Sequence, residues 1–154
     1  MPFAMPKHIE TIVRGVCVAE GQILLCQNRK AEICYLPGGH IDFGEPAARA
    51  LEREILEEMG LPSRAGRFLG AAEHRFVQQG KPKAEINLVF ALDIPGLNPE
   101  AGPPPSAEAW IRFFWHPLAD LAAVRLEPAS LIPALARWLD HGPGWVGMED
   151  AAAP

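Results

Sequence analysis

The chain has 154 residues, of which 49% are hydrophobic and 21% are charged, and its formal net charge at pH 7 is −5. This balance is typical of one compact globular domain. A protein that binds the nucleic-acid backbone normally carries a basic stripe, so the acidic balance argues against nucleic acid as a partner. No segment reaches the roughly 18 apolar residues of a membrane span, and the N-terminus lacks a signal-peptide pattern. We therefore expect a cytoplasmic protein without a membrane partner.

Three cysteines, Cys17, Cys26 and Cys34, lie in apolar stretches. Their number is odd and their spacing is not that of metal ligands. We expect buried free thiols in a reducing compartment rather than disulfides.

The first part of the chain predicts strands. Residues 9–18 and 22–27 are apolar and rich in β-branched side chains, and Glu20-Gly21 between them predicts a hairpin. Residues 35–36 then lead into Pro37-Gly38-Gly39, a turn at which glycine lets the backbone approach another group closely.

The next segment predicts a helix with marked ends. Pro46 suits the first helical position, with Glu45 at or near the N-cap. Gly60 suits the left-handed position after the last turn, and Pro62 prevents continuation. The apolar stripe that would pack against a sheet consists of Ala47, Ala50, Leu51 and Ile55.

The second half of the chain continues with alternating strands and helices. The expected elements are strands at 67–77 and 84–94 around a hairpin at 79–82, a proline-rich surface loop at 97–106, a strand at 110–115, and helices at 118–124 and 129–139. There is no internal repeat. We expect a single domain over residues 1–140 and a flexible tail over 141–154.

Three glutamates cluster on the predicted helix. Residues three and four apart share a helix face, so Glu54, Glu57 and Glu58 fall within an arc of about 100°. Like charges at this spacing destabilise a helix by roughly 0.2–0.5 kcal/mol per pair, and helix dipoles disfavour anions near the C-terminus. Mg²⁺ is usually held by a few carboxylates together with substrate phosphates, so the cluster indicates a cation site.

A solvated ion-pair ladder is the alternative interpretation. Glu45, Arg49, Arg53 and Glu57 recur every four residues, as in an exposed helix face. This ladder leaves the Glu54 and Glu58 pair without a basic partner at helical spacing, which favours the metal site.

The segment from Gly39 to Leu61 resembles the signature of the Nudix hydrolases. That pattern is a glycine, five residues, a glutamate, seven residues, and then Arg-Glu-aliphatic-x-Glu-Glu-x-Gly-aliphatic. Every fixed position is filled, by Gly39, Glu45, Arg53, Glu54, Ile55, Glu57, Glu58, Gly60 and Leu61. The resemblance implies an α/β fold, the Nudix-like α/β/α sandwich with a mixed β-sheet.

The resemblance also implies roles for the residues of this segment. Glu57 and Glu58 would be the principal metal ligands, and Glu54 a ligand that also orients the attacking water or accepts its proton. The Gly39 carbonyl would be a further ligand to Mg²⁺, with Mn²⁺ as a substitute. Arg53 belongs to the catalytic set because it would hold the glutamates in place through Glu45.

Four further residues are candidates for substrate contacts or for a general base outside the helix. His74 and Glu85 lie on predicted strands, where the alternatives are a structural histidine and a carboxylate at a strand edge. Tyr35 and Arg29 precede the glycine turn and could stack on a base or meet a phosphate, although core packing and surface charge are the default interpretations.

Substrate identity is less defined. Relatives that cleave ADP-ribose commonly have a proline about fifteen residues after the position of Gly60, where this chain has Arg75 and Phe76. We expect a Mg²⁺-dependent hydrolase of a pyrophosphate linkage in a nucleoside diphosphate linked to another moiety, first a nucleoside triphosphate or a nucleotide sugar. The alternatives are an ADP-ribose-type pyrophosphatase and a non-catalytic nucleotide-sensing module.

The partner would be a small nucleotide-derived molecule, and a homodimer is a further option. Four aromatic side chains could supply an apolar interface, although alternation along a strand explains them equally. They are Trp110, Phe113, Phe114 and Trp115.

Overall fold

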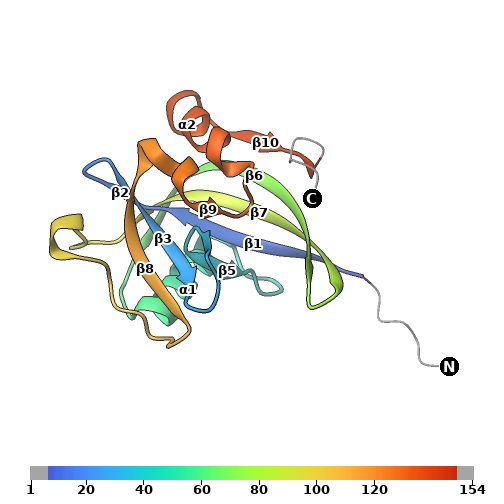
Figure 1. The fold of residues 1–154 in the computed structure, drawn as a ribbon, viewed down its shortest axis with the longest axis horizontal. Coiled ribbons are helices and arrows are strands. Elements are labelled where there is room, and N and C mark those ends of the chain that lie inside the picture. The colour runs from blue at the N-terminus through green and yellow to red at the C-terminus, as the bar shows by residue number, and fades with distance from the viewer. Residues whose placement is uncertain (1–6, 149–154) are drawn as a thin grey trace.

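The computed structural model describes residues 7–148, which form two sheets and two α-helices (Figure 1). The strands are β1 (Ile9–Val16), β2 (Val18–Ala19), β3 (Gln22–Asn28), β4 (Ile33–Tyr35), β5 (Gly38–His40), β6 (Arg64–Gln78), β7 (Lys81–Asp93), β8 (Ile111–Pro117), β9 (Arg125–Leu126) and β10 (Gly144–Val146). The helices are α1 (Ala47–Met59) and α2 (Leu131–His141), with short 3₁₀ turns η1 (Pro99–Ala101) and η2 (Leu118–Ala123).

The first sheet is mixed, as predicted, with the strand order β10-β6-β7-β1-β5. The β1/β7 and β6/β10 pairs are parallel, whereas β6/β7 and β1/β5 are antiparallel. The long β6–β7 hairpin turns at Gln79 and Gly80, both with positive φ. The β1/β5 pair is functionally central, because β5 carries the glycine turn.

The second sheet shows that the strand predicted over residues 9–18 is interrupted. β1 belongs to the first sheet, and the chain crosses at Cys17 into β2, which pairs with β3 in the second. The Cys17 carbonyl accepts a hydrogen bond from Leu24 across this crossing, at 2.9 Å. The predicted hairpin is confirmed between β2 and β3, with Glu20 and Gly21 both at positive φ.

Helix α1 starts one residue later than predicted. Pro46 is the N-cap rather than the first helical residue, because its ψ of 138° is extended. Glu45 does not cap the helix, since its carboxylate accepts from the Asp42 amide at 3.1 Å and binds Arg53. The C-terminal prediction is confirmed, because Gly60 has φ 70° and donates to the Leu56 carbonyl.

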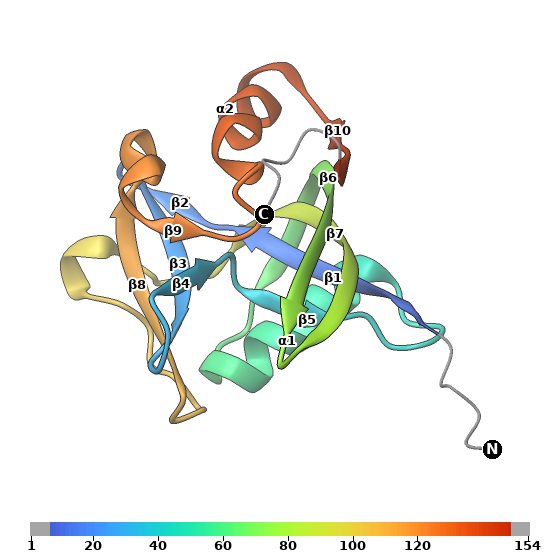
Figure 2. The same ribbon diagram turned by 45° about the vertical axis from the view of Figure 1, so that its right-hand side comes forward.

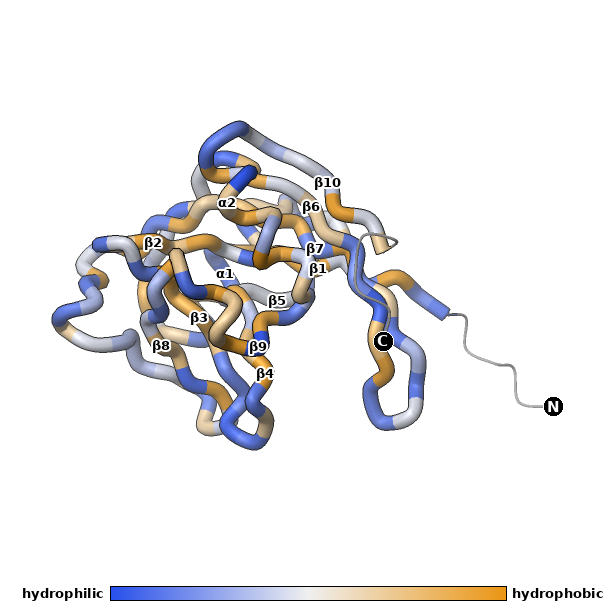
Figure 3. Tube along the Cα trace, turned by 45° about the horizontal axis from the view of Figure 1, so that its top comes forward, coloured by the Kyte–Doolittle hydropathy of each residue, from blue (hydrophilic) through white to orange (hydrophobic). Residues whose placement is uncertain are grey.

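The two helices cover opposite sides of the first sheet, which gives the predicted layered α/β fold (Figures 1 and 2). Helix α1 packs on one core with Ala50, Leu51, Ile55 and Met59, whereas Ala47 is only half-buried. Helix α2 packs on the other core, which it shares with parts of both sheets. Figure 3 shows that the hydrophobic residues follow the strands and that the hairpin tips are mainly hydrophilic.

The C-terminal segment is more ordered than predicted. Residues 144–146 form β10, parallel to β6, and Val146 is buried in the α2 core. Their contacts with α2 explain the difference, because Gly70 and Gly144 leave room for the Trp138 ring. Residues 149–154 of the expected tail lie outside the described part, and the boundary at residue 140 stays a prediction. Residues 118–123 form a 3₁₀ segment rather than an α-helix.

Side-chain burial bears on three other expectations. All three cysteines are buried and free, as predicted. Phe113 is a core residue, whereas Trp110 is 46% exposed, and the homodimer stays a prediction. No helix within residues 7–148 is long and apolar enough to cross a membrane.

The Trp138 contact predicts different effects for two alanine substitutions on β6. A Cβ at Gly70 would overlap the buried Trp138 ring, so Gly70→Ala should lower the free energy of unfolding by about 1–3 kcal/mol, the usual cost of overpacking. The matched control is Gly66→Ala, where a Cβ would lie 3.3 Å from the Ala91 methyl and should cost much less. Urea unfolding of both variants measures the difference, and equal destabilisation would refute this account of α2 docking.

Candidate metal and catalytic site

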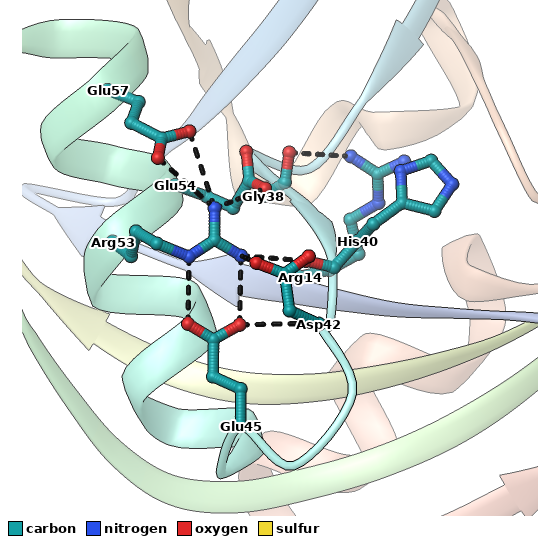
Figure 4. A network of polar contacts seen from close by, with 8 residues as sticks. All are labelled: Arg14, Gly38, His40, Asp42, Glu45, Arg53, Glu54 and Glu57. Carbon is teal, nitrogen blue, oxygen red and sulfur yellow. Dashed lines mark hydrogen bonds and ion pairs between the residues drawn. The ribbon is translucent and has the colours of Figure 1, made fainter.

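Arg53 is the centre of the polar network around helix α1 (Figure 4). Its Nε and Nη2 donate to the two carboxylate oxygens of Glu45, at 2.8 and 2.9 Å. Its Nη1 donates to Glu54 at 3.0 Å and to Glu57 at 3.3 Å. Nη2 also reaches the His40 carbonyl, at 3.0 Å. One guanidinium therefore joins the helix, its preceding loop and strand β5.

This network explains how like charges are tolerated on α1. Hydrogen bonds from Arg53 lower the pKa of Glu45 to about 2, and the bond with Glu45 is the main cause that raises the pKa of Arg53. Both groups are therefore charged at neutral pH. Arg49 instead pairs with Glu52, at 2.8 Å, so the predicted ladder is not continuous along the helix.

The glycine turn brings the backbone against Glu54. A Cβ at Gly38 would overlap the Val13 carbonyl oxygen, and the φ of 145° at Gly38 also requires glycine. A Cβ at Gly39 would overlap the carboxylate of Glu54. The missing side chain of Gly39 therefore creates the space in which the Glu54 carboxylate lies directly against strand β5.

The Oε2 atom of Glu58 is buried and has no hydrogen-bond partner, although the residue as a whole is half-buried. Burial, followed by the charge of Glu54, raises the pKa of Glu58 to about 8, and Arg14 acts in the opposite direction. Burial likewise raises the pKa of Glu54. Arg53 binds Glu54 but is not a hydrogen-bond partner of Glu58, so it compensates the charge of Glu54 and not that of Glu58.

The carboxylate and carbonyl oxygens around α1 are of the type that binds a hard divalent cation, although the carboxylates do not point toward one common position. Within residues 7–148, no three acidic, histidine or cysteine side chains are arranged to hold an ion. The Glu57 side chain is 56% exposed and is turned toward Arg53. The unpaired Glu58 oxygen and the Gly39 gap nevertheless fit a cation that needs oxygen ligands. The ligand set of Gly39, Glu54, Glu57 and Glu58 stays a prediction.

Two of the predicted substrate contacts lie on the second sheet or beside it. Arg29 is exposed in the loop after β3 and faces an open hollow of about 420 Å³ together with Lys30 and Arg112. Tyr35 is half-buried in β4, and the Arg14 guanidinium lies 5.7 Å from its ring centre. Their roles toward a substrate stay predictions.

The other two candidates pair with each other on the β6–β7 hairpin. His74 and Glu85 are direct partners across the two strands. His74 Nε2 lies 4.0 Å from Glu127, and its ring stacks on Phe76 at 4.9 Å. Burial lowers the pKa of His74, so its neutral form is favoured. The pair therefore belongs to the first sheet, apart from the Arg53 network, and its role as a base stays a prediction.

Sequence reasoning missed two residues that connect the sheet to the glycine turn. Arg14 Nη1 donates to the carbonyls of Leu36, at 3.0 Å, and Gly38, at 3.5 Å. Its Nε donates to Asn87 at 3.5 Å, and Asn87 in turn donates to Glu85 at 3.3 Å. Asn87 is only 1% exposed. The signal available in the sequence was a polar residue inside each of two apolar strand runs.

The layered α/β fold places an acidic helix beside a glycine turn. A model of the NUDIX domain matches residues 6–139, and the chain belongs to the Nudix family.

Individual relatives carry different names. The chain is 33% identical over 99 residues to an ADP-ribose pyrophosphatase of Methanocaldococcus jannaschii, across 62% of this chain and 57% of that protein. It is 24% identical over 128 residues to an RNA pyrophosphohydrolase of Photobacterium profundum, across 73% and 74%. The structure of a NUDIX hydrolase from Nitrosomonas europaea has a TM-score of 0.66 and 16% identity, with 96% and 98% covered, which shows a shared fold. The chain thus spans little more than half of the first of these proteins.

The unpaired carboxylate predicts how Glu58→Gln changes stability. Glutamine keeps the shape but cannot ionise, so above pH 8, where Glu58 would carry a buried charge, the variant should melt at or above the wild-type temperature in EDTA. Mg²⁺ at one hundred times its Kd should stabilise the wild type by about 2.7 kcal/mol, because it binds only the native state, and should not stabilise the variant.

Differential scanning fluorimetry with and without Mg²⁺ measures both effects. Glu52→Gln is the matched control, since Glu52 lies on the same helix but accepts from Arg49 and the Ala65 amide. It should keep the full response to Mg²⁺. An undiminished response in Glu58→Gln would exclude Glu58 as a ligand.

Proposed function

We propose that this protein is a Mg²⁺-dependent hydrolase of a pyrophosphate linkage in a small nucleotide-derived substrate, with Mn²⁺ able to replace Mg²⁺. The observation that carries the proposal is the buried, unpaired Glu58 carboxylate beside Glu54, within a complete family motif. A polar group buried without a partner costs free energy, and a bound cation would remove that cost. The buried free cysteines agree with a reducing compartment such as the cytoplasm.

The helix residues divide the chemistry among them. A bound divalent cation would neutralise the developing charge on phosphate and lower the pKa of a bound water. Glu57 and Glu58 would be the principal ligands, with Glu54 and the Gly39 carbonyl beside them. Arg53 holds Glu54 and Glu57 at fixed positions from Glu45.

Glu54 can also handle the proton of the attacking water. Its Oε1 accepts from Arg53, and its carboxylate lies against the backbone of Gly39. One oxygen is thus occupied by a fixed donor, which leaves Oε2 to orient a water molecule or accept its proton. Arg53 acts by positioning, because its donors are directed at carboxylates and the His40 carbonyl.

The substrate that we place first is a nucleoside triphosphate or a nucleotide sugar. Arg75 and Phe76 stand where ADP-ribose-cleaving relatives commonly have proline, which weighs against ADP-ribose. The ADP-ribose pyrophosphatase of M. jannaschii is nevertheless a 33% identical relative, so this substrate is the second candidate. A non-catalytic sensing module is disfavoured because every ligand position of the motif is present.

Replacement of one ligand predicts the loss of turnover. Mutation of a residue that only orients a metal ligand typically lowers activity about 10- to 100-fold. Loss of a ligand carboxylate itself, in Glu57→Gln, should therefore reduce turnover by at least about 100-fold. Glu57 is largely exposed, and the variant should fold normally. The assay supplies Mg²⁺ and a panel of nucleoside triphosphates, nucleotide sugars and dinucleotides, and follows phosphate or pyrophosphate release.

Glu52→Gln should retain activity and controls for the helix substitution. One preferred compound, lost in Glu57→Gln alone, supports the proposal. Tight binding of a compound without turnover would favour the sensing module, and unchanged turnover in Glu57→Gln would refute the metal assignment.

A further inference from the structure

Strand β1 holds the segment before Gly39 by three consecutive carbonyl groups. Arg14 Nη1 donates to the carbonyls of Leu36 and Gly38, at 3.0 and 3.5 Å. The Gly15 amide donates to the carbonyl between them, that of Pro37, at 2.8 Å. The path of the backbone into Gly39 is therefore fixed from β1, and one guanidinium group donates two of these three hydrogen bonds.

Arg14 is in turn oriented from the interior of the first sheet. Its Nε donates to Oδ1 of Asn87, and Nδ2 of Asn87 donates to Glu85. Asn87 is the only buried polar residue in the described part of the chain, at 1% exposure. A buried amide is costly unless it is hydrogen-bonded, so both of its ends constrain the geometry. The Tyr35 ring also lies beside the guanidinium.

We propose that Arg14 is a positioning residue for the reaction, which holds the Pro37-Gly38-Gly39 turn in the geometry needed for metal binding, and that Asn87 orients Arg14. This inference rests on the proposed function, because it assigns Arg14 to the same metal site. Arg14 acts through the backbone, since its donors bind carbonyl groups of the turn.

Two physical effects of Arg14 predict opposite outcomes and can be separated. The first effect is the set of hydrogen bonds that Arg14 donates to the turn and to Asn87, which we call the bracket. These bonds need the rigid, forked guanidinium group of arginine, and lysine, a point charge, cannot reproduce them. The second is positive charge near Glu58, which would repel a metal ion. If the bracket dominates, both lysine and glutamine at position 14 weaken metal binding. If charge dominates, lysine behaves as wild type and glutamine binds metal more tightly.

The test measures Mn²⁺ binding without substrate, by the loss of the free-ion electron paramagnetic resonance signal. Arg14→Lys and Arg14→Gln should each weaken Mn²⁺ binding by about 10-fold, as is typical when a residue that orients a metal ligand is replaced. The matched controls are Arg75→Lys and Arg75→Gln, since Arg75 is exposed on β6 of the same sheet. They should bind Mn²⁺ as the wild type does.

A second variant keeps the test decisive if Arg14 variants fold poorly. Asn87→Leu removes the bond to Arg14 Nε but leaves the arginine in place, and should weaken Mn²⁺ binding in the same direction by a smaller factor. In turnover assays, Arg14→Lys should raise the Mg²⁺ concentration for half-maximal rate, with KM for the preferred compound at saturating Mg²⁺ unchanged.

Each outcome decides one hypothesis. Wild-type affinity for Mn²⁺ in Arg14→Lys would overturn the proposal that the bracket supports metal binding. If the Arg14 variants are unfolded, wild-type affinity for Mn²⁺ in Asn87→Leu would overturn it. A raised KM with an unchanged Mg²⁺ midpoint also overturns it, because Arg14 would then contact substrate. Absence of Mn²⁺ binding by the wild type would instead refute the metal site of the proposed function.

Discussion

The burial of the Glu58 carboxylate without a partner is the constraint on which the rest of the site depends. A buried polar atom without a partner costs free energy, and ionisation of its group would cost more. The pKa of Glu58 is raised to about 8, and the pKa of Glu54 beside it is raised as well. This helix face therefore presents two carboxyl groups that favour protonation or a bound cation. Ala50, Leu51 and Ile55 anchor the adjoining face of α1 in a core.

The surrounding residues divide into those that compensate charge and those that create space. Arg53 binds Glu45, Glu54 and Glu57 at once, so that one cation offsets much of the repulsion along α1. Gly39 creates the space, because any side chain there would displace the Glu54 carboxylate. Neither arrangement extends to Glu58. The structure therefore leaves one buried oxygen without a partner, and a metal ion would supply one.

The sequence predicted most of the elements because their signals are local. Helix α1 follows from an apolar stripe between Pro46 and Gly60, and the hairpins follow from Glu20-Gly21 and Gln79-Gly80. The errors have tertiary causes. β1 ends at Val16 because the chain changes sheets at Cys17, and β10 forms because it can pair with β6 beside Trp138. β1 pairs with β7 and β10 pairs with β6, and neither partner strand is close in sequence.

The candidate site also contains one contact that the sequence predicted and one that it could not predict. The contact between Arg53 and Glu45 was expected from the resemblance to the family motif, and it is present. Arg14 and Asn87 are 73 positions apart and meet only through the parallel β1/β7 pair, so their hydrogen bond could not be predicted from either segment alone. The position of a polar residue in an apolar strand indicates that it needs a partner, but only the fold supplies the partner's identity.

The most direct test of the central claim is the position of a Mn²⁺ ion in crystals of the protein, located by anomalous scattering. We expect a peak at about 2.1 Å, the usual Mg²⁺–oxygen distance, from Glu58 Oε2, with Glu57 turned from Arg53 to join it. A peak elsewhere, with Glu58 Oε2 still unpaired, would exclude Glu58 as a metal ligand.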